Sequence, residues 1–106
     1  MGYDLHITRA DSWAANEGRE ITRQEWLSLV ADDQELALDP VNGEDYALWS
    51  GMCRYPDPWF QWWRGNISTK NPDRAVVNKM LQLASRLGAK VQGDDGEVYK
   101  SADEWR

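Results

Sequence analysis

Apolar and polar residues alternate one by one at the start of the chain, between Gly2 and Thr8. A period of two places every second side chain on the same side of an extended backbone, so this segment is predicted to be a strand. Aromatic residues fill the run from Trp59 to Trp63. We expect another strand there, with Trp59 and Trp63 on one side and the intervening aromatic residues Phe60 and Trp62 on the other.

Two segments repeat apolar residues at helical spacing instead. In the first, Thr22 and Glu25 have the spacing of a capping box, in which each side chain accepts a hydrogen bond from the backbone N–H of the other. An apolar stripe follows directly. A short helix is therefore predicted from Arg23 to Ala31.

The second helical segment is longer. Asn71 is its expected N-cap and Pro72 its first residue, where a missing backbone N–H costs nothing. Asp73 complements the positive helix start, and apolar residues recur at spacings of three and four as far as Leu87. Gly88 is the expected end. An amphipathic helix of this kind is predicted to lie across the sheet.

Turn residues divide the rest of the chain. The stretch from Asp32 to Gly43 is predicted to be an exposed connection, in which Glu35 to Leu38 could form one helical turn. Pro56 and Pro58 predict an extended, rigid loop. The other expected elements are strands at Asp45–Ser50, Ile67–Lys70, Ala89–Gln92 and Glu97–Lys100, and a last helical turn at Ser101–Glu104.

These elements predict an α+β fold in a single domain that spans residues 1–106. The expected sheet is antiparallel, with about four to six strands formed by two hairpins and the N-terminal strand, and it packs against one long and one short helix. A chain of 106 residues is long enough to bury a core without disulfides or metals.

Charge is distributed unevenly along the chain. Residues 1–57 hold 12 Asp and Glu against 4 Arg, whereas residues 58–106 hold 6 against 8 Lys and Arg, within an overall net charge of −6. Between Asp32 and Asp57, seven carboxylates face one cation, Arg54. We expect this stretch to project negative potential from one part of the surface, and a basic protein is the natural partner.

The same composition argues against several classes of function. An acidic protein repels phosphate backbones, so no nucleic acid is expected as a partner. No apolar run approaches the roughly 18 residues that would cross a bilayer, so no membrane is expected either. Cys53 is the only cysteine and cannot form a disulfide within the chain, which favours the cytoplasm.

Metal and cofactor motifs are also missing from the sequence. One His and one Cys exclude the zinc-ligand spacings, and no glycine-rich phosphate loop follows a strand. The acidic run from Asp94 to Glu97 lacks the spacing of a calcium loop and is predicted to be a hairpin turn. We expect neither a metal nor a cofactor.

Seven Trp accompany a single Phe. Tryptophan combines a large apolar ring with an N–H that needs a partner, so it suits a small core or the centre of an interface. Most of the seven are expected in the core. Trp59 and Trp63 are the exception, because the strand from Trp59 to Trp63 has more aromatic residues than one buried side can use. They either meet a partner or lie under a loop.

An enzymatic alternative uses His6, the one imidazole. His6 shares a strand side with Asp4, so a general base oriented by a carboxylate can be drawn, and Cys53 could assist as a nucleophile. A small hydrolase or transferase would follow. A histidine bonded to a neighbouring carboxylate on a strand is more often structural, and no third catalytic group is visible.

Four segments resemble a family of small, largely uncharacterised bacterial proteins: Tyr3–Arg9, Glu25–Leu27, Lys70–Asp73 with Lys79–Leu81, and Val91–Tyr99. The resemblance spans nearly the whole chain. Some members look like immunity proteins encoded beside secreted toxin domains, so the resemblance implies a bacterial cytoplasmic protein and suggests an immunity role.

Our leading hypothesis is a binding protein, most concretely an immunity-type inhibitor that docks on a basic toxin domain and blocks its active site. Carboxylates would speed the encounter and buried indoles would slow dissociation. A homo-oligomer joined by exposed aromatic residues is a further alternative. The residues expected to bind the partner are Asp32, Asp33, Glu35, Glu44, Asp45 and Asp57, with Trp59 and Trp63 as anchors.

Overall fold

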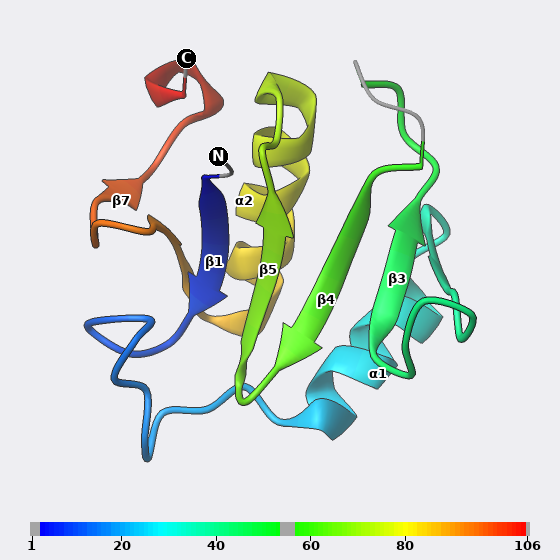
Figure 1. The fold of residues 1–106 in the computed structure, drawn as a ribbon, viewed down its shortest axis with the longest axis horizontal. Helices are drawn as coiled ribbons and strands as arrows, with labels where there is room; N and C mark the ends of the chain where they lie inside the picture. Colours follow the sequence, from blue (N-terminus) through cyan, green and yellow to red (C-terminus); the bar gives the residue numbers. More distant parts are fainter. Residues whose placement is uncertain (1–2, 54–56, 106) are drawn as a thin grey trace.

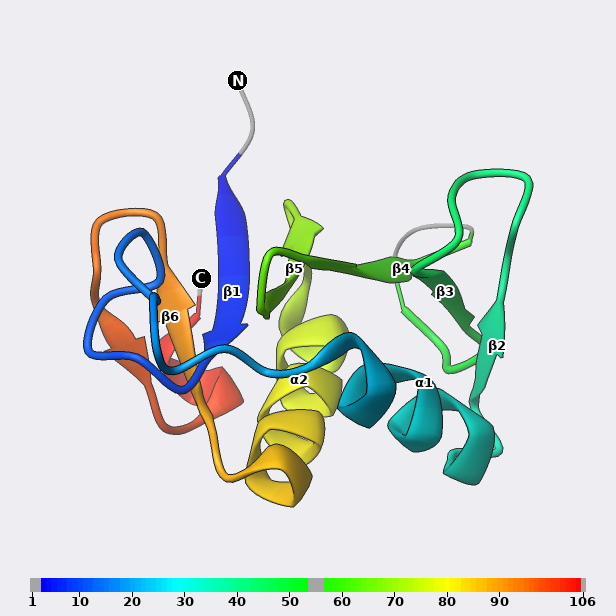
Figure 2. The same cartoon turned by 90° about the horizontal axis from the view of Figure 1, so that it is seen from below.

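The computed structural model describes residues 3–53 and 57–105. In these residues, seven strands form one antiparallel sheet in the order β2-β3-β4-β5-β1-β6-β7, and two helices cover one of its faces (Figures 1 and 2). The elements are β1 (Asp4–Thr8), α1 (Arg23–Asp32), β2 (Leu36–Leu38), β3 (Tyr46–Trp49), β4 (Trp59–Trp63), β5 (Asn66–Lys70), α2 (Arg74–Leu87), β6 (Lys90–Gly93), β7 (Val98–Tyr99) and the 3₁₀ helix η1 (Ala102–Glu104).

The predicted α+β class is confirmed, and the sheet has one strand more than the four to six expected. The additional strand is β2, where the sequence predicts an exposed connection or a helical turn. β2 pairs with β3, with Leu36 opposite Trp49 and Leu38 opposite Ala47. Burial of Leu36 against the core outweighs the weak local preference of this short acidic segment. The predicted strand start at Gly2, the cation Arg54 and the loop residues Tyr55 and Pro56 lie outside the described residues.

Helix α1 begins as predicted. The Glu25 N–H donates to Thr22 Oγ1 at 3.1 Å, and the Thr22 N–H donates to Glu25 Oε1 at 2.9 Å, which completes the capping box. The helix ends one residue later than expected, at Asp32. Its Trp26 is fully buried, so the helix is held by its apolar side as well as by its cap.

Helix α2 begins later than predicted, so the expected N-cap at Asn71 is wrong. The N-cap is Asp73, whose carboxylate accepts from the Val76 N–H at 3.0 Å. Asn71 has a left-handed backbone (φ 48°), and its side-chain oxygen accepts from the Tyr3 N–H at 2.8 Å instead. Asn71 and Asp73, on either side of Pro72, could each cap the helix. The hydrogen bond from Tyr3 engages Asn71 and leaves Asp73 as the cap. The end at Gly88 is as predicted, with φ of 63°.

The core lies between the sheet and the two helices. Alternate strand residues point toward the helices and are buried, which contributes roughly 1.5–3 kcal/mol for each large side chain. The pattern within β4 is as predicted for its inner side, since Phe60 is fully buried and Trp62 packs against the core. The largest fully buried side chains are Trp26, Phe60, Leu5, Ile7, Ile21, Ile67, Met80 and Leu83.

The other face of the sheet carries neither α1 nor α2. Figure 2 shows both helices on the same side of the strands, and the connection between β2 and β3 rises on the opposite side. In Figure 1, this second face is turned toward the viewer, and no helix crosses β3, β4 or β5. The position of the helices therefore decides which strand residues remain accessible.

Candidate functional site

We call the uncovered part of the sheet the open face. It consists of the residues of β3, β4 and β5 that point away from the helices. Cross-strand pairing aligns them in rows, because Leu48 lies opposite Trp59 and Gln61 lies opposite both Tyr46 and Ser68. The residues of the open face are Tyr46, Leu48, Trp59, Gln61, Trp63, Asn66, Ser68 and Lys70.

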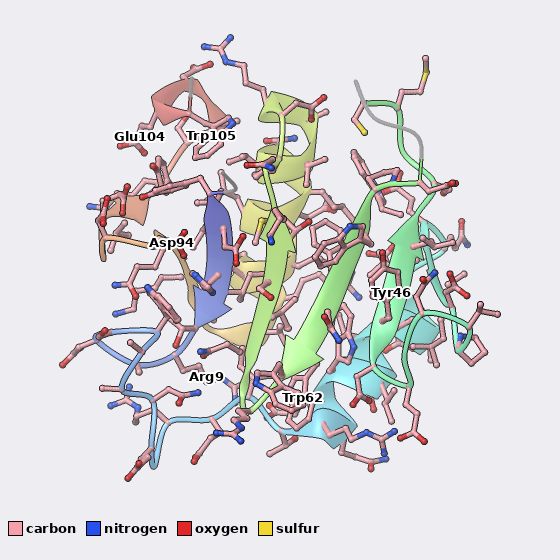
Figure 3. All side chains as sticks on the ribbon, in the orientation of Figure 1. Arg9, Tyr46, Trp62, Asp94, Glu104 and Trp105 are labelled. Atoms are coloured by element: carbon pink, nitrogen blue, oxygen red, sulfur yellow. The ribbon has the colours of Figure 1, made fainter. Side chains whose placement is uncertain are left out.

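Aromatic rings dominate the open face. The rings of Tyr46 and Trp59 stack with their centroids 5.1 Å apart and their planes 22° apart, and Figure 3 shows Tyr46 on β3 next to β4. The Trp63 side chain is 63% exposed, and the guanidinium carbon of Arg64 lies 5.2 Å from its ring centroid. The predicted outward side of β4, Trp59 with Trp63, is therefore the side that faces away from the helices.

The indole N–H groups divide the seven tryptophans into two classes. Five of them donate within the protein: Trp13 to Asp94 O, Trp26 to Asp45 O, Trp49 to Glu35 Oε1, Trp62 to Ile21 O and Trp105 to Pro72 O. Within residues 3–53 and 57–105, the indole N–H groups of Trp59 and Trp63 donate to no protein acceptor. A partly buried tryptophan such as Trp59 ordinarily finds such an acceptor, whereas the exposed Trp63 is open to solvent. Both rings therefore have donors to offer to another molecule.

A loop covers the neighbouring part of the same face, over β1 and β6. Trp13 stacks on His6 with the ring centroids 3.8 Å apart, and the backbone N–H of Trp13 donates to Gln92 Oε1 at 2.7 Å. The Trp13 carbonyl accepts from Asn66 Nδ2 at 2.8 Å. These bonds hold the loop against the strands. The loop therefore leaves the β3, β4 and β5 part of this face accessible.

His6 is 6% exposed beneath this loop. Its Nε2 lies 2.8 Å from Asp94 Oδ1, so Asp94 rather than Asp4 is the carboxylate that orients the ring. Asp94 also accepts from the Asp4 N–H at 2.9 Å. With one ring face covered by Trp13 and one nitrogen bonded to Asp94, the imidazole fixes the loop and the β6–β7 turn in place.

The other partner in the enzymatic alternative is remote. Cys53 follows β3, and the strands β4 and β5 lie between β3 and β1. Strands are spaced about 4.8 Å apart, which places His6 roughly 14 Å from that side of the sheet. The arrangement does not bring His6 and Cys53 together as a base and a nucleophile.

The acidic stretch does not form one patch. Asp33 and Glu35 lie on the helix side, where Lys79 Nζ donates to Asp33 Oδ2 at 2.8 Å and to Glu35 Oε1 at 2.7 Å. Arg86 Nη1 also donates to Asp33 Oδ2, at 2.8 Å. Asp33 is only 8% exposed. Both carboxylates are thus neutralised by cations from α2 and hold α2 to the end of α1.

The pKa of Asp33 records this environment. Burial acts to raise the pKa of Asp33. The hydrogen bonds from Lys79 and from the Glu35 N–H, the charge of Lys79 and the hydrogen bond from Arg86 outweigh burial and hold the pKa below its ordinary value. The hydrogen bond from Lys79, followed by that from the Trp49 indole, likewise lowers the pKa of Glu35. Both groups stay ionised at neutral pH, inside a structural network.

Two further acids lie at the start of α1. Arg23 Nε donates to Asp45 Oδ1 at 2.6 Å, and Arg23 Nη2 lies 3.7 Å from Glu44 Oε2. The Glu44 side chain is 87% exposed, so its charge remains available to solvent. Asp32 is also exposed, at the last residue of α1.

The remaining acids border the open face. Asp39 lies next to Tyr46, since its backbone N–H donates to the Tyr46 carbonyl at 2.8 Å, and Asp57 lines a pocket together with Trp59. Burial raises the pKa of the Tyr46 phenol, and the charges of Asp39 and Asp57 raise it further. Asp57 is exposed and precedes β4. Asp39 precedes the β2–β3 loop and accepts from Asn42 Nδ2 at 2.6 Å. Of the residues expected to bind a partner, Asp57, Trp59 and Trp63 are therefore brought to one face.

Some residues of this surface escape sequence reasoning. Tyr46 belongs to the site because β3 pairs with β4. The period-two pattern of the expected strand, which puts Tyr46 and Leu48 on one side, is the signal that could have predicted its position. Glu17 and Glu20 lie in a loop with no periodic pattern, yet they line the same pocket as Trp63. Only the path of the loop around the end of the sheet brings them there.

No metal site or membrane span is found in the described part of the chain. Within residues 3–53 and 57–105, no three His, Cys, Asp or Glu side chains are grouped so as to hold a metal ion. None of the helices in those residues has the length and apolar character needed to cross a bilayer.

Comparison with known proteins adds no relative. No model of a protein family matches the chain. No curated protein and no solved structure matches it either. A functional proposal must therefore stand on the geometry of the open face.

Proposed function

We propose that this chain is a protein-binding module that holds a basic partner protein on the open face of its sheet. Its most concrete form is an immunity-type inhibitor in the bacterial cytoplasm that sequesters a toxin domain. One observation carries the proposal: Trp59 and Trp63, alone among the seven tryptophans, use no protein acceptor for their indole N–H within the described residues.

The aromatic residues supply the anchoring part of the proposal. Binding hot spots are enriched in Trp and Tyr, because these rings bury a large area with few rotatable bonds. Tyr46 and Trp59 are already stacked, so little side-chain freedom is lost when a partner covers them. Trp63 is 63% exposed and has most of its area still to bury.

The charges supply the steering part. The chain carries a net charge of −6, and Asp39 and Asp57 lie at the border of the open face. Glu44 and Asp32 add exposed carboxylates elsewhere on the surface. An acidic surface of this kind accelerates the encounter with a cationic protein. Asp33, Glu35 and Asp45 are paired internally and are not part of the proposed contact surface.

Calorimetric titration with the protein encoded by the adjacent gene tests the proposal. We expect a saturable 1:1 complex. Trp59→Ala and Trp63→Ala should each weaken binding by about thirtyfold or more, since truncating a central anchor costs about 2 kcal/mol or more. Asn78→Ala, an exposed change on the helix side, is the matched control and should leave the affinity unchanged.

Two outcomes would contradict the proposal. The first is the absence of any complex with that protein. The second is a complex that tolerates both tryptophan substitutions. The open face could instead be occupied by a second copy of the chain. Light scattering of the chain alone tests this by measuring its mass in solution. A dimer that dissociates on Trp59→Ala would assign the open face to self-association instead.

A further inference from the structure

We propose that a pocket at the end of the sheet, between Trp63 and the carboxylates Glu17 and Glu20, receives an arginine side chain of the basic partner. The inference rests on the proposed function and names the chemistry of one contact. The pocket has a volume of about 590 Å³ and is formed by the loop before α1 and the β4–β5 turn. It adjoins the open face, because Trp63 belongs to both.

The first support is the accessible indole. Trp63 is the one tryptophan whose ring is largely exposed among the described residues, at 63%. An indole face is the best aromatic surface for a cation, which it attracts through its quadrupole. The backbone of Trp63 is fixed, since it pairs with Asn66 across the β4–β5 hairpin. An exposed indole at the border of a pocket is suited to a cationic side chain.

The second support is a guanidinium that the ring already holds. Arg64 Cζ lies 5.2 Å from the Trp63 ring centroid. Arg64 is exposed on the turn, and its own carbonyl accepts from Asn16 Nδ2 at 2.7 Å, so its backbone is fixed while its side chain extends into solvent. The molecule itself thus shows that this ring accepts the chemistry proposed for the partner.

The third support is the charge around the ring. Glu17 and Glu20 are both exposed, and neither makes an ion pair with a described residue of the chain. Glu20 packs directly on the turn, since a Cβ built on Gly65 would lie 2.5 Å from Glu20 Cβ. A planar guanidinium can stack on an indole and bond a carboxylate through two N–H groups at once. An ammonium group cannot do both, which favours arginine over lysine.

The other aromatic end of the open face is less suited to a cation. The pocket beside Trp59 is lined by Asp57, but also by Lys70. Lys70 belongs to β5, the strand that pairs with β4 and its Trp59. At that end one cation, Lys70, offsets the one carboxylate, whereas at the Trp63 end the two carboxylates Glu17 and Glu20 outnumber the one cation, Arg64. The partner's arginine is therefore assigned to the Trp63 end, and the Tyr46–Trp59 stack to apolar contact.

The probe is the peptide acetyl-Gly-Gly-Arg-Gly-Gly-amide, compared with the same peptide containing citrulline, which has the shape of arginine without its charge. NMR of the ¹⁵N-labelled full chain follows the indole N–H signals. We expect a saturable shift of the Trp63 signal with the arginine peptide, a smaller shift of the Trp59 signal, and no saturable shift of either with the citrulline peptide.

Three variants sharpen the test. Glu17→Gln combined with Glu20→Gln should weaken binding of the arginine peptide at least about threefold, because two charge pairs are lost. Arg64→Asn should strengthen it by about twofold to fivefold, since the intramolecular guanidinium no longer competes for the ring. Asparagine tolerates the left-handed backbone of residue 64 (φ 48°), so the turn is kept. Asp103→Asn, a distant exposed acid, is the control and should change nothing.

Equal shifts with both peptides, or a double Glu variant that binds the arginine peptide as well as the native chain does, would overturn the inference. The same variants distinguish a failure of this inference from a failure of the proposed binding function. If the protein encoded by the adjacent gene loses affinity with Trp59→Ala but not with the double Glu variant, the open face binds a partner and the arginine assignment alone is wrong.

Discussion

Lys79 shows how a single residue decides where the acidic stretch lies. Its side chain is 5% exposed and donates to Asp33, Glu35 and Gln82 at 2.7–3.1 Å. A buried ammonium group is tolerated only when its donors are satisfied. The three acceptors satisfy the ammonium group, which reaches them from one position on α2. Two of the carboxylates that suggest an acidic surface in the sequence are therefore neutralised, and one of them, Asp33, is buried.

Replacing Lys79 by methionine should therefore destabilise the fold by about 3–5 kcal/mol, because the buried Asp33 carboxylate loses one of its two cations. Chemical denaturation of the two proteins at neutral pH measures the difference in unfolding free energy. Lys100→Met, at an exposed position, is the control. A loss below about 1 kcal/mol would show that Arg86 alone compensates Asp33.

Two glycine residues, Gly18 and Gly65, give a second prediction about single residues. Gly65 and Gly18 have similar left-handed backbones, with φ of 88° and 82°. A Cβ at Gly65 would lie 2.5 Å from Glu20 Cβ, whereas nothing lies within 4 Å of a Cβ at Gly18. Gly18→Ala should cost about 1 kcal/mol for the backbone alone, and Gly65→Ala should cost more, about 2–3 kcal/mol. Thermal unfolding of the two variants compares them, and equal costs would contradict the crowding at Gly65.

At the scale of elements, one arginine joins three segments that are remote in sequence. Arg9 follows β1, donates through Nη1 and Nη2 to Glu25 of α1 at 2.9 and 2.6 Å, and donates through Nε to the carbonyl of Leu87 at the end of α2 at 2.8 Å. Glu25 is also half of the capping box of α1. Figure 3 shows Arg9 below the end of β1.

This arrangement predicts a pH dependence. The hydrogen bonds from Arg9, and then the Thr22 N–H, lower the pKa of Glu25 from its ordinary value of 4.5 to about 2. A carboxyl group whose pKa is lowered by folding contributes stability above its unfolded pKa and loses it as the pH falls toward the folded pKa. The difference in unfolding free energy between the native chain and Glu25→Gln should therefore shrink from about pH 5 to about pH 2. A difference that stays constant over this range would contradict the pairing.

Most elements are predictable from the sequence because their signals are local. The capping box at Thr22 and the alternation from Trp59 to Trp63 each lie within a few residues, and both predict the observed element. β2 is not predictable in this way, because its three residues become a strand only by pairing with β3. Asn71 and Asp73 are equivalent as local caps. The hydrogen bond that engages Asn71 comes from Tyr3, 68 residues away in sequence, so no local signal distinguishes the two.

At the scale of the whole molecule, the two helices on one side of the sheet create the candidate site. Sequence periodicity indicates that Trp59 and Trp63 share a side, but it does not reveal which side the helices cover. The acidic stretch is divided for a similar reason. Its cations Lys79 and Arg86 are 46 and 53 residues away from Asp33 in sequence, and no local pattern connects them.

Asp39 and Asp57, the acids at the border of the open face, predict how the association rate depends on salt concentration. Steering by exposed charges is screened over about 10 Å at 0.1 M salt, so the association rate with a basic partner should fall as salt is added. Asp39→Asn combined with Asp57→Asn should slow association at low salt by at least about twofold and flatten this salt dependence. Stopped-flow mixing measures the rates, with Asp103→Asn as the control. An unchanged salt dependence would exclude these two carboxylates from steering.

The central claim is that a basic partner is held on the open face, and hydrogen exchange of the chain with and without the protein encoded by the adjacent gene tests it most directly. We predict that the complex slows amide exchange in β3, β4 and the β4–β5 turn, around Tyr46, Trp59 and Trp63, and leaves exposed α2 residues such as Asn78 and Ser85 unchanged. Protection confined to α1 and α2, with the open face exchanging as in the isolated chain, would contradict it.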